Sequence, residues 1–259
     1  MSEPQPARRA DPSSPADRAA SFERGAALYA GVRPAYPVAC VDWLLPAGAE
    51  RVLDLAAGTG LLTTSLAARG LDVVAVEPSA AMLTELRERL PGVTTHLGTA
   101  EAIPLPGRCV DAVLVGQAWH WFEPSRAAAE VARVLRPGGQ VGVTWNDRDE
   151  RAGWVARFGE ILHRGDRLDP RTAHDHASPA LGPAFTEVEH ASFPWSDRVR
   201  TTDLRMLAAS RSYLLTLPDD ARDALLDAVD HLVLTHPDLA GRSVVDLPYV
   251  ARAFRARLR

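Results

Sequence analysis

The amino-acid sequence predicts an α/β protein built on a doubly wound, mostly parallel sheet. Short apolar runs alternate five times with segments of helical periodicity between residues 52 and 145, as strand–helix–strand units do. The first apolar run leads through a glycine turn straight into a helical pattern, which is typical of a nucleotide site above such a sheet. A length of 259 residues fits one domain with a subdomain, and two small domains remain possible.

Composition and charge narrow the classes of function. The formal net charge of −4 argues against a general affinity for nucleic acid or for an anionic membrane surface, and no apolar run approaches the length of a membrane span. The chain contains no lysine, which excludes a Schiff-base lysine and a Walker-type phosphate lysine. Cys40 and Cys109 match no metal-ligand spacing, so we expect a reduced, cytoplasmic setting. Residues 1–20 are expected to form a disordered tail.

The elements of the predicted sheet can be placed from their apolar patterns. Each strand is a short apolar run, and each helix keeps an apolar stripe that ends near glycine or proline. On this basis, helices are expected at 21–30, 38–45, 61–70, 78–90 and 124–135. Strands are expected at 52–55, 71–77, 93–97, 110–116 and 140–145, with a tight turn at 137–139 before the last of them.

Beyond residue 146 the alternation weakens and helical patterns dominate. Helices are expected at 152–163, 202–217 and 219–235, and strands at 185–193 and 243–254. Within one domain, the chain is expected to divide into a cofactor-binding core at 21–146, a cap with strand six at 147–242, and a last strand at 243–259. Aromatic and apolar side chains on the cap helices are expected to enclose a pocket for a small hydrophobic or amphiphilic molecule.

The glycine turn after the first strand distinguishes between two kinds of cofactor. In a dinucleotide-binding turn a third glycine would stand at position 63, where this chain has Thr63. The turn also carries Asp54, and a carboxylate there suits a cofactor with an amino group better than one with a pyrophosphate. Glu77 ends the second strand about 20 residues after the turn, a position from which a carboxylate reaches both ribose hydroxyls.

Successive motifs give the chain a resemblance to a known family. In order and spacing, the segments 52–60, 77–82, 98–104 and 133–139 resemble motifs of the class I S-adenosylmethionine-dependent methyltransferases, in particular the small-molecule branch called type 11. The resemblance implies a Rossmann-like sheet of seven strands, mostly parallel with the last strand antiparallel, and a helical cap after strand five. It also implies S-adenosylmethionine as cofactor, S-adenosylhomocysteine as product and a small-molecule acceptor.

The resemblance assigns cofactor contacts to the residues that match the family's motifs. Ala56 departs from the family by replacing the first glycine of the turn, and Thr99 stands where an acid commonly faces the adenine. Arg33 lies in a segment that covers the cofactor in similar proteins and is expected to pair with its carboxylate; the alternative is a helix packed on the sheet edge. The expected cofactor residues are Tyr29, Arg33, Asp54, Ala56, Gly58, Gly60, Glu77, Pro78, Met82, Thr99, Ala100, Glu101 and Gln117.

An aromatic cluster follows the fourth strand, where the carboxyl ends of parallel strands face a ligand. His120 within it is the candidate general base, because an imidazole accepts a proton near neutral pH; the alternative is a structural histidine packed among aromatic rings. No carboxylate cluster stands at this strand end, so no metal is expected. The expected acceptor-binding residues are Trp119, His120, Trp121, Trp145 and Tyr213.

Three functions fit these residues. The first is transfer of a methyl group to an oxygen, nitrogen or carbon atom of a small molecule by in-line substitution, which depends on alignment more than on acid–base chemistry. The second is a non-methylating cyclisation or rearrangement in secondary metabolism, since a fold does not dictate its chemistry. The third is cofactor binding without catalysis. A nucleic-acid substrate is disfavoured because the sequence lacks a basic patch and the proline-flanked base-flipping motif, and we expect a monomer or homodimer.

Overall fold

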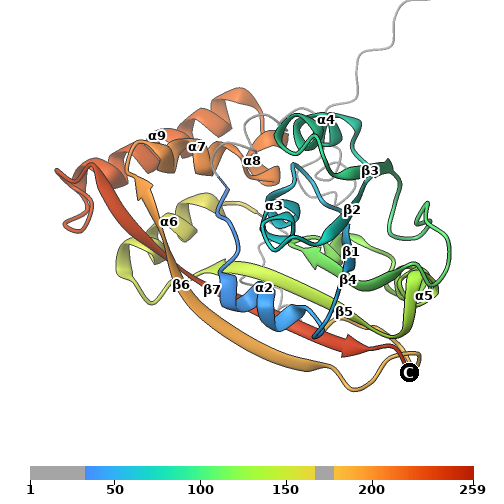
Figure 1. The fold of residues 1–259 in the computed structure, drawn as a ribbon. Helices are drawn as coiled ribbons and strands as arrows, with labels where there is room; N and C mark the ends of the chain where they lie inside the picture. The colour runs from blue at the N-terminus through green and yellow to red at the C-terminus, as the bar shows by residue number, and fades with distance from the viewer. Residues whose placement is uncertain (1–32, 167–177) are drawn as a thin grey trace, which may run out of the picture.

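A mixed sheet of seven strands forms the centre of the structure, a computed structural model that describes residues 33–166 and 178–259 (Figure 1). The strand order is β3-β2-β1-β4-β5-β7-β6, and β7 runs antiparallel to its two neighbours while the other strands are parallel to one another. The predicted Rossmann-like sheet with an antiparallel last strand is confirmed. The strands are β1 (Arg51–Leu55), β2 (Asp72–Glu77), β3 (Thr94–Leu97), β4 (Val110–Gly116), β5 (Leu135–Arg148), β6 (Glu189–Arg200) and β7 (Val244–Arg257).

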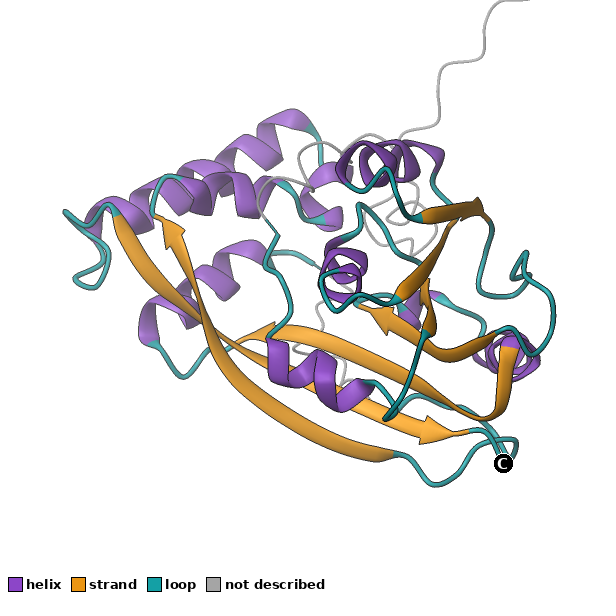
Figure 2. Cartoon of the chain, viewed as in Figure 1, coloured by secondary structure: helices purple, strands orange, loops and turns teal. Residues whose placement is uncertain are grey.

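Helices cover both faces of the sheet (Figure 2). Val52 of β1 packs with the residues of α2 and α3 on one face, whereas Leu53 packs with those of α5 on the other. Because both faces are covered, the parallel strands appear in the sequence as unbroken apolar runs. The helices are α2 (Val38–Leu44), α3 (Leu61–Ala67), α4 (Ala80–Arg89), α5 (Pro124–Val134), α6 (Gly153–Leu162), α7 (Asp203–Ala209), α8 (Ser212–Thr216) and α9 (Asp219–Thr235), with a short 3-10 turn at Trp119–Trp121.

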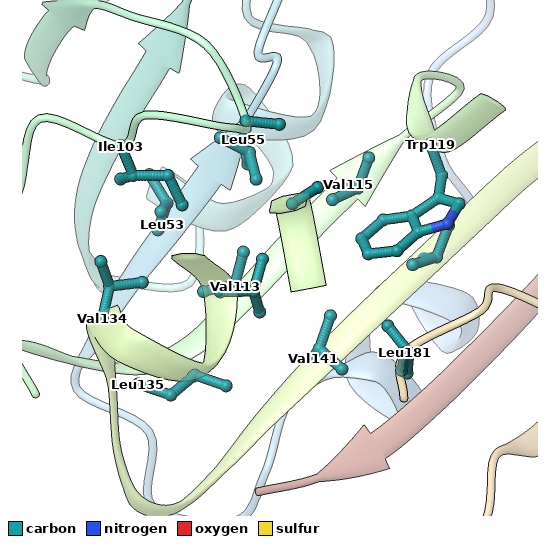
Figure 3. Packing of buried hydrophobic residues seen from close by; sticks show 14 of the residues in the cluster. Leu53, Leu55, Ile103, Val113, Val115, Trp119, Val134, Leu135, Val141 and Leu181 are labelled. Atoms are coloured by element: carbon teal, nitrogen blue, oxygen red, sulfur yellow. The ribbon is translucent and has the colours of Figure 1, made fainter. Parts of the chain in front are cut away.

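Buried apolar side chains pack between the central strands and α5 (Figure 3). Leu53, Val113 and Val141 come from neighbouring strands and are fully buried together with Val134 of α5. Full burial of one such side chain stabilises the fold by about 1.5–3 kcal/mol relative to exposure. This packing fixes the carboxyl ends of β1, β4 and β5, where the site described below is located.

Four helices after β5 form the cap that the sequence predicts. Along the chain, α6 follows β5, and α7, α8 and α9 come after β6 and before β7. In space, α9 contacts both α6 and α7 (Figure 1). The cap has a core of its own, in which Phe158, Leu204 and Val229 pack with Leu247 of β7. The last strand therefore connects the cap to the sheet.

Three boundaries beyond β5 differ from the prediction. The helix expected at 202–217 is split near Ser210 into α7 and α8, β6 begins later than residue 185 and runs to Arg200, and β7 continues to Arg257. β6 and β7 pair as one long antiparallel ribbon, and the edge strand β6 has no fully buried side chain. The strand at 185–193 is predicted from alternating apolar and polar residues, and this pattern is too weak to set the ends of a strand whose side chains stay accessible.

Other predictions concern the turn before β5 and the amino-terminal region. The turn expected at 137–139 is a register shift inside β5, where Gly138 takes a left-handed φ of 74°. The helix expected at 21–30 and the tail at 1–20 lie outside the described residues. Within residues 33–166 and 178–259, no helix is both long enough and apolar enough to cross a membrane.

Candidate active site

Two adjoining cavities open at the carboxyl ends of the central strands. The first, which we call the motif cavity, has a volume of about 530 Å³ and is lined by residues between Tyr36 and Phe122. The second, which we call the arginine cavity, has a volume of about 730 Å³ and is lined by residues between Arg33 and Arg252. The strand order reverses between β1 and β4, and ligands of open α/β sheets bind at such a reversal. The two cavities share four lining residues, which are Tyr36, Leu61, Gln117 and Trp121.

The motif cavity brings together most of the predicted cofactor residues. Arg33 lies instead in the arginine cavity, Gly60 lines neither cavity, and Tyr29 is outside the described residues. The predicted residues that line the motif cavity are Asp54, Ala56, Gly58, Glu77, Pro78, Met82, Thr99, Ala100, Glu101 and Gln117.

The glycine turn between β1 and α3 uses left-handed backbone conformations. Ala56, Gly58 and Gly60 have φ values of 58°, 57° and 85°. A Cβ atom on Gly60 would lie 2.9 Å from Leu86 Cγ, so this glycine is also required by packing. Ala56 adopts the same region with a side chain, which costs about 1–2 kcal/mol relative to a right-handed conformation. The conformation explains why a glycine is common at that position of the motif.

Glu77 is buried at the end of β2, and its carboxylate is held in a fixed orientation. Its Oε2 accepts a hydrogen bond from the backbone N–H of Gly58 at 2.9 Å, and its Oε1 accepts one from Ser79 at 3.0 Å. The carboxylate thus links the glycine turn to the start of α4, and it is located on the wall of the motif cavity.

Asp54 is the second acid of the motif cavity and is only 1% exposed. Burial raises the pKa of its carboxyl to about 7, although the Thr63 hydroxyl lowers it by donating a hydrogen bond to Oδ2 at 2.6 Å. The nearby charge of Glu77 raises the pKa further. Thr63 stands where a dinucleotide turn would have its third glycine, and its hydroxyl orients the acid that distinguishes this turn.

The loop after β3 forms another wall of the motif cavity and is held from the side of α5. Arg133 donates to the carbonyl oxygens of Leu105 at 2.7 Å and Ile103 at 2.8 Å, and Glu130 accepts from the backbone N–H of Ile103 at 2.8 Å. Glu101 accepts from the backbone N–H of Glu123 at 2.9 Å, which ties the loop to the start of α5. Sequence reasoning used Arg133 only as part of a motif and missed this supporting role.

Gly116 ends β4, and Gln117, which follows it, lies at the boundary between the cavities. Gln117 has a φ of 62°, which is uncommon for a side chain other than glycine and occurs often at functional sites. Its Nε2 donates to the carbonyl oxygen of Asn146 at 3.3 Å. A Cβ atom on Gly116 would overlap the hydroxyl of Tyr36, so the glycine leaves space for the tyrosine ring on the shared wall.

His120 lies exposed at the edge of the arginine cavity. Its Nδ1 accepts a hydrogen bond from Trp145 Nε1 at 3.3 Å, and this bond favours the neutral tautomer that carries its proton on Nε2. A general base needs a free lone pair, whereas this tautomer presents an N–H group. The geometry therefore favours His120 as a hydrogen-bond donor.

The predicted acceptor residues separate into two groups. His120, Trp121 and Trp145 line the arginine cavity. Trp119 is buried in the core on the α5 face because the 3-10 turn directs its ring against Phe122, and Tyr213 is buried in the cap, where its hydroxyl donates to Arg164 O at 3.0 Å. These last two line neither cavity.

Arginines that the sequence did not single out line the second cavity. Arg148 ends β5, Arg211 lies in the link between α7 and α8, and Tyr249 of β7 stands near both. Arg33 joins them and donates through Nη2 to the carbonyl oxygen of Ser210 at 2.9 Å. No local motif surrounds Arg148 or Arg211, and arginine is frequent in the chain, so sequence alone gave no signal for either.

Comparisons with known proteins identify relatives of the whole chain. The family model for a methyltransferase domain matches residues 53–143. An uncharacterised methyltransferase of Mycobacterium tuberculosis is 51% identical over 243 residues, covering 93% of this chain and 97% of the relative. A methyltransferase structure from Anaeromyxobacter dehalogenans has a TM-score of 0.64 at 25% identity, covering 87% of this chain and 97% of that one. A phosphoethanolamine N-methyltransferase of Haemonchus contortus, solved with S-adenosylhomocysteine, shares the fold with a TM-score of 0.52 at 17% identity, covering 96% of this chain and 60% of that one.

Proposed function

This chain belongs to the class I S-adenosylmethionine-dependent methyltransferases, and we propose that it transfers the methyl group to a small-molecule acceptor bound in the arginine cavity. The main observation in support is that the two cavities share a wall, to which Tyr36, Gln117 and Trp121 contribute. Two ligands in adjoining cavities meet at such a wall, and methyl transfer requires the donor carbon and the acceptor atom to meet.

The residues of the motif cavity fit S-adenosylmethionine in size and chemistry. A volume of about 530 Å³ lies within the range of small-molecule sites. Glu77 offers an oriented carboxylate for the ribose hydroxyls, and Asp54 offers an acid whose buried charge a cationic amino group would stabilise. Thr99, Ala100 and Glu101 would line the adenine, and Met82 lies on the same cavity wall.

The chemistry needs little acid–base assistance from the protein. When bound, S-adenosylmethionine would supply an electrophilic methyl carbon to the nucleophilic atom of the acceptor, and its sulfur would keep the electron pair of the broken carbon–sulfur bond. Tyr36, Gln117 and Trp121 would align the acceptor atom and exclude water. His120 would donate an Nε2–H bond to the acceptor, and an acceptor that must lose a proton would release it to solvent.

Finer predictions accompany this proposal. We propose an oxygen, nitrogen or carbon atom of a small molecule as the acceptor, with no nucleic acid and no membrane as partner. A place in secondary metabolism, a cytoplasmic location and a monomeric or homodimeric state stay predictions.

The proposal is tested by incubating the purified chain with isotope-labelled S-adenosylmethionine and a panel of small acids, amines, phenols and esters. We expect at least one acceptor to gain the labelled methyl group in equal amount with S-adenosylhomocysteine. An acceptor that is altered but unmethylated, with no release of S-adenosylhomocysteine, would support the cyclisation or rearrangement instead. Tight cofactor binding without turnover of any acceptor would count against catalysis.

The role of His120 can be separated from that of a general base with the same assay. Replacing His120 by Asn, which keeps an N–H donor, should retain more activity than replacing it by Ala, for which we expect a loss of about threefold or more, the value of one hydrogen bond. A wild-type rate that rises with pH through the histidine range, together with a flat pH profile in both variants, would instead support His120 as a general base.

A further inference from the structure

Three arginine side chains from distant parts of the sequence meet in the arginine cavity. Arg33 precedes α2, Arg148 ends β5, and Arg211 links α7 to α8. They are close enough to repel one another, since the charges of Arg33 and Arg148 both lower the pKa of Arg211. A fold that gathers like charges in this way needs something of opposite charge in or near the cavity.

Two of the three acidic side chains that line the cavity are paired with other arginines. Asp147 forms an ion pair with Arg252 at 2.7 Å, and Asp149 forms one with Arg151 at 2.5 Å. Glu150 also lines the cavity and attracts Arg148, but it makes no ion pair with a side chain of the described residues. The rim therefore carries acids, and the buried side chain of Asp166 attracts Arg211 from nearby. Within residues 33–166 and 178–259, no acid forms an ion pair with Arg148 or with Arg211.

The contacts of Arg148 and Arg211 are weak for such buried cations. Arg148 lies over the ring of Phe158 at 5.5 Å, and its Nε is buried without a hydrogen-bond partner among the described residues. Arg211 Nη2 lies 3.4 Å from His163 Nε2, a distance at the limit of a hydrogen bond. Burial lowers the pKa of the Arg148 guanidinium and holds that of Arg211 well below its ordinary range. An oxyanion would relieve both the desolvation and the mutual repulsion.

The neighbouring groups suit an oxyanion. A guanidinium presents a planar set of N–H donors that matches carboxylate and phosphate, and it binds them with two parallel hydrogen bonds. Tyr249 is buried beside Arg148, Arg33 and Arg211 and lines the same cavity, so its hydroxyl adds a further donor.

We propose that Arg148 and Arg211, with Arg33 and Tyr249, form an anion subsite that holds a carboxylate or phosphate group of the methyl acceptor. The inference rests on the proposed function, since it names the class of acceptor for the same site. The carboxylate of the cofactor is the competing occupant. Against it, Arg148 and Arg211 line only the arginine cavity, and no arginine of the described residues lines the motif cavity.

The test uses the full chain saturated with S-adenosylhomocysteine, titrated by calorimetry with succinate, inorganic phosphate and the neutral analogue succinamide. We expect succinate or phosphate to bind and succinamide to bind at least tenfold more weakly. Arg148→Met and Arg211→Met should each weaken anion binding at least tenfold and leave the affinity for S-adenosylhomocysteine within twofold. The control is Arg157→Met, an arginine on the exposed side of α6 that lines neither cavity and should change nothing.

Folding of the variants gives an independent readout. Replacing a buried, unneutralised charge by an apolar side chain is neutral or stabilising, so Arg148→Met and Arg211→Met should unfold at the same temperature as the wild type or higher. If either variant unfolds instead, Arg148→Lys or Arg211→Lys, which keeps the charge but loses the paired donors, should still weaken anion binding.

The outcomes separate the two proposals. The subsite is refuted if succinamide binds as well as both anions, or if the variants weaken S-adenosylhomocysteine as much as they weaken the anion. Anion binding without methylation of any acceptor would leave the subsite in place and refute the proposed function. Methylation confined to neutral or cationic acceptors would support the proposed function and refute the anion subsite.

Discussion

The motif cavity and the arginine cavity share a wall but carry opposite charge. The charged side chains that line the motif cavity are acids, Asp54, Glu77 and Glu101, and no basic side chain of the described residues joins them. The arginine cavity is lined by five arginines, among them Arg148 and Arg211, and they outnumber its three acids. A cofactor with a sulfonium and an ammonium group suits the first, and an anionic acceptor suits the second. The sign of the charge can therefore direct each ligand to its own cavity and repel it from the other.

The largest effect should come from removing the acid that ends β2. Glu77→Ala should weaken binding of S-adenosylmethionine at least tenfold by calorimetry, because two charge-assisted hydrogen bonds to the ribose would be lost. Anion binding in the arginine cavity should not change. The exposed Glu88 of α4 provides the control, since Glu88→Ala should leave both affinities unaltered. An unchanged cofactor affinity in folded Glu77→Ala protein would refute the ribose assignment.

The second effect is a pH dependence confined to the motif cavity. The pKa of Asp54 is about 7 in the folded protein and near 4 in an unfolded chain, so the folded protein holds the proton over that interval. Asp54 loses its proton in the unfolded chain but keeps it in the folded protein, so the free energy of unfolding falls as pH rises from about 4 to about 7. A cationic amino group favours the ionised acid, so the affinity for cofactor should rise severalfold between about pH 6 and pH 8.

The matched variant for this prediction is Asp54→Asn, which keeps the shape and removes the titration. Calorimetry should show a flat affinity over the same pH interval, and denaturant unfolding should lose the decline with pH. A wild-type affinity that falls with rising pH would contradict the contact between Asp54 and the amino group. The pH dependence of anion binding should be the same in the wild type and in Asp54→Asn.

The smallest effect concerns the residue by which the glycine turn departs from its family. Ala56 adopts a φ of 58°, so Ala56→Gly should raise the free energy of unfolding by up to about 1 kcal/mol, measured by denaturant titration, with cofactor affinity within about twofold. The same substitution at Ala67, in the right-handed last turn of α3, should lower stability by about 0.5–1 kcal/mol. Equal signs for the two variants would show that the left-handed strain at Ala56 is absent.

The two cavities also differ in how far the sequence predicts them. The motif cavity depends on short contiguous segments, so the order and spacing of the motifs around Asp54, Gly58 and Glu77 predicted many of the residues that line it. The arginine cavity joins Arg148 and Arg211 through tertiary packing, and no spacing in the chain encodes their approach. Among the five expected acceptor residues, Trp119 and Tyr213 lie in hydrophobic cores. The sequence could not show this, because aromatic residues are used both in cores and in binding sites.

The same distinction holds for the fold. The buried parallel strands β1, β2 and β4 were predicted within one residue of their bounds because both faces are apolar. The start of β6 was not, since its side chains remain accessible and its pairing depends on β7.

The position of β7 has a consequence for the order in which the molecule can assemble during synthesis. β7 lies between β5 and β6, so β6 has no place in the sheet until residues 244–257 have left the ribosome. No described residue beyond Phe122 lines the motif cavity, whereas Tyr249 and Arg252 of β7 line the arginine cavity. A nascent chain emerges from its amino terminus, so we expect the site for the methyl donor to precede the site for its acceptor in time.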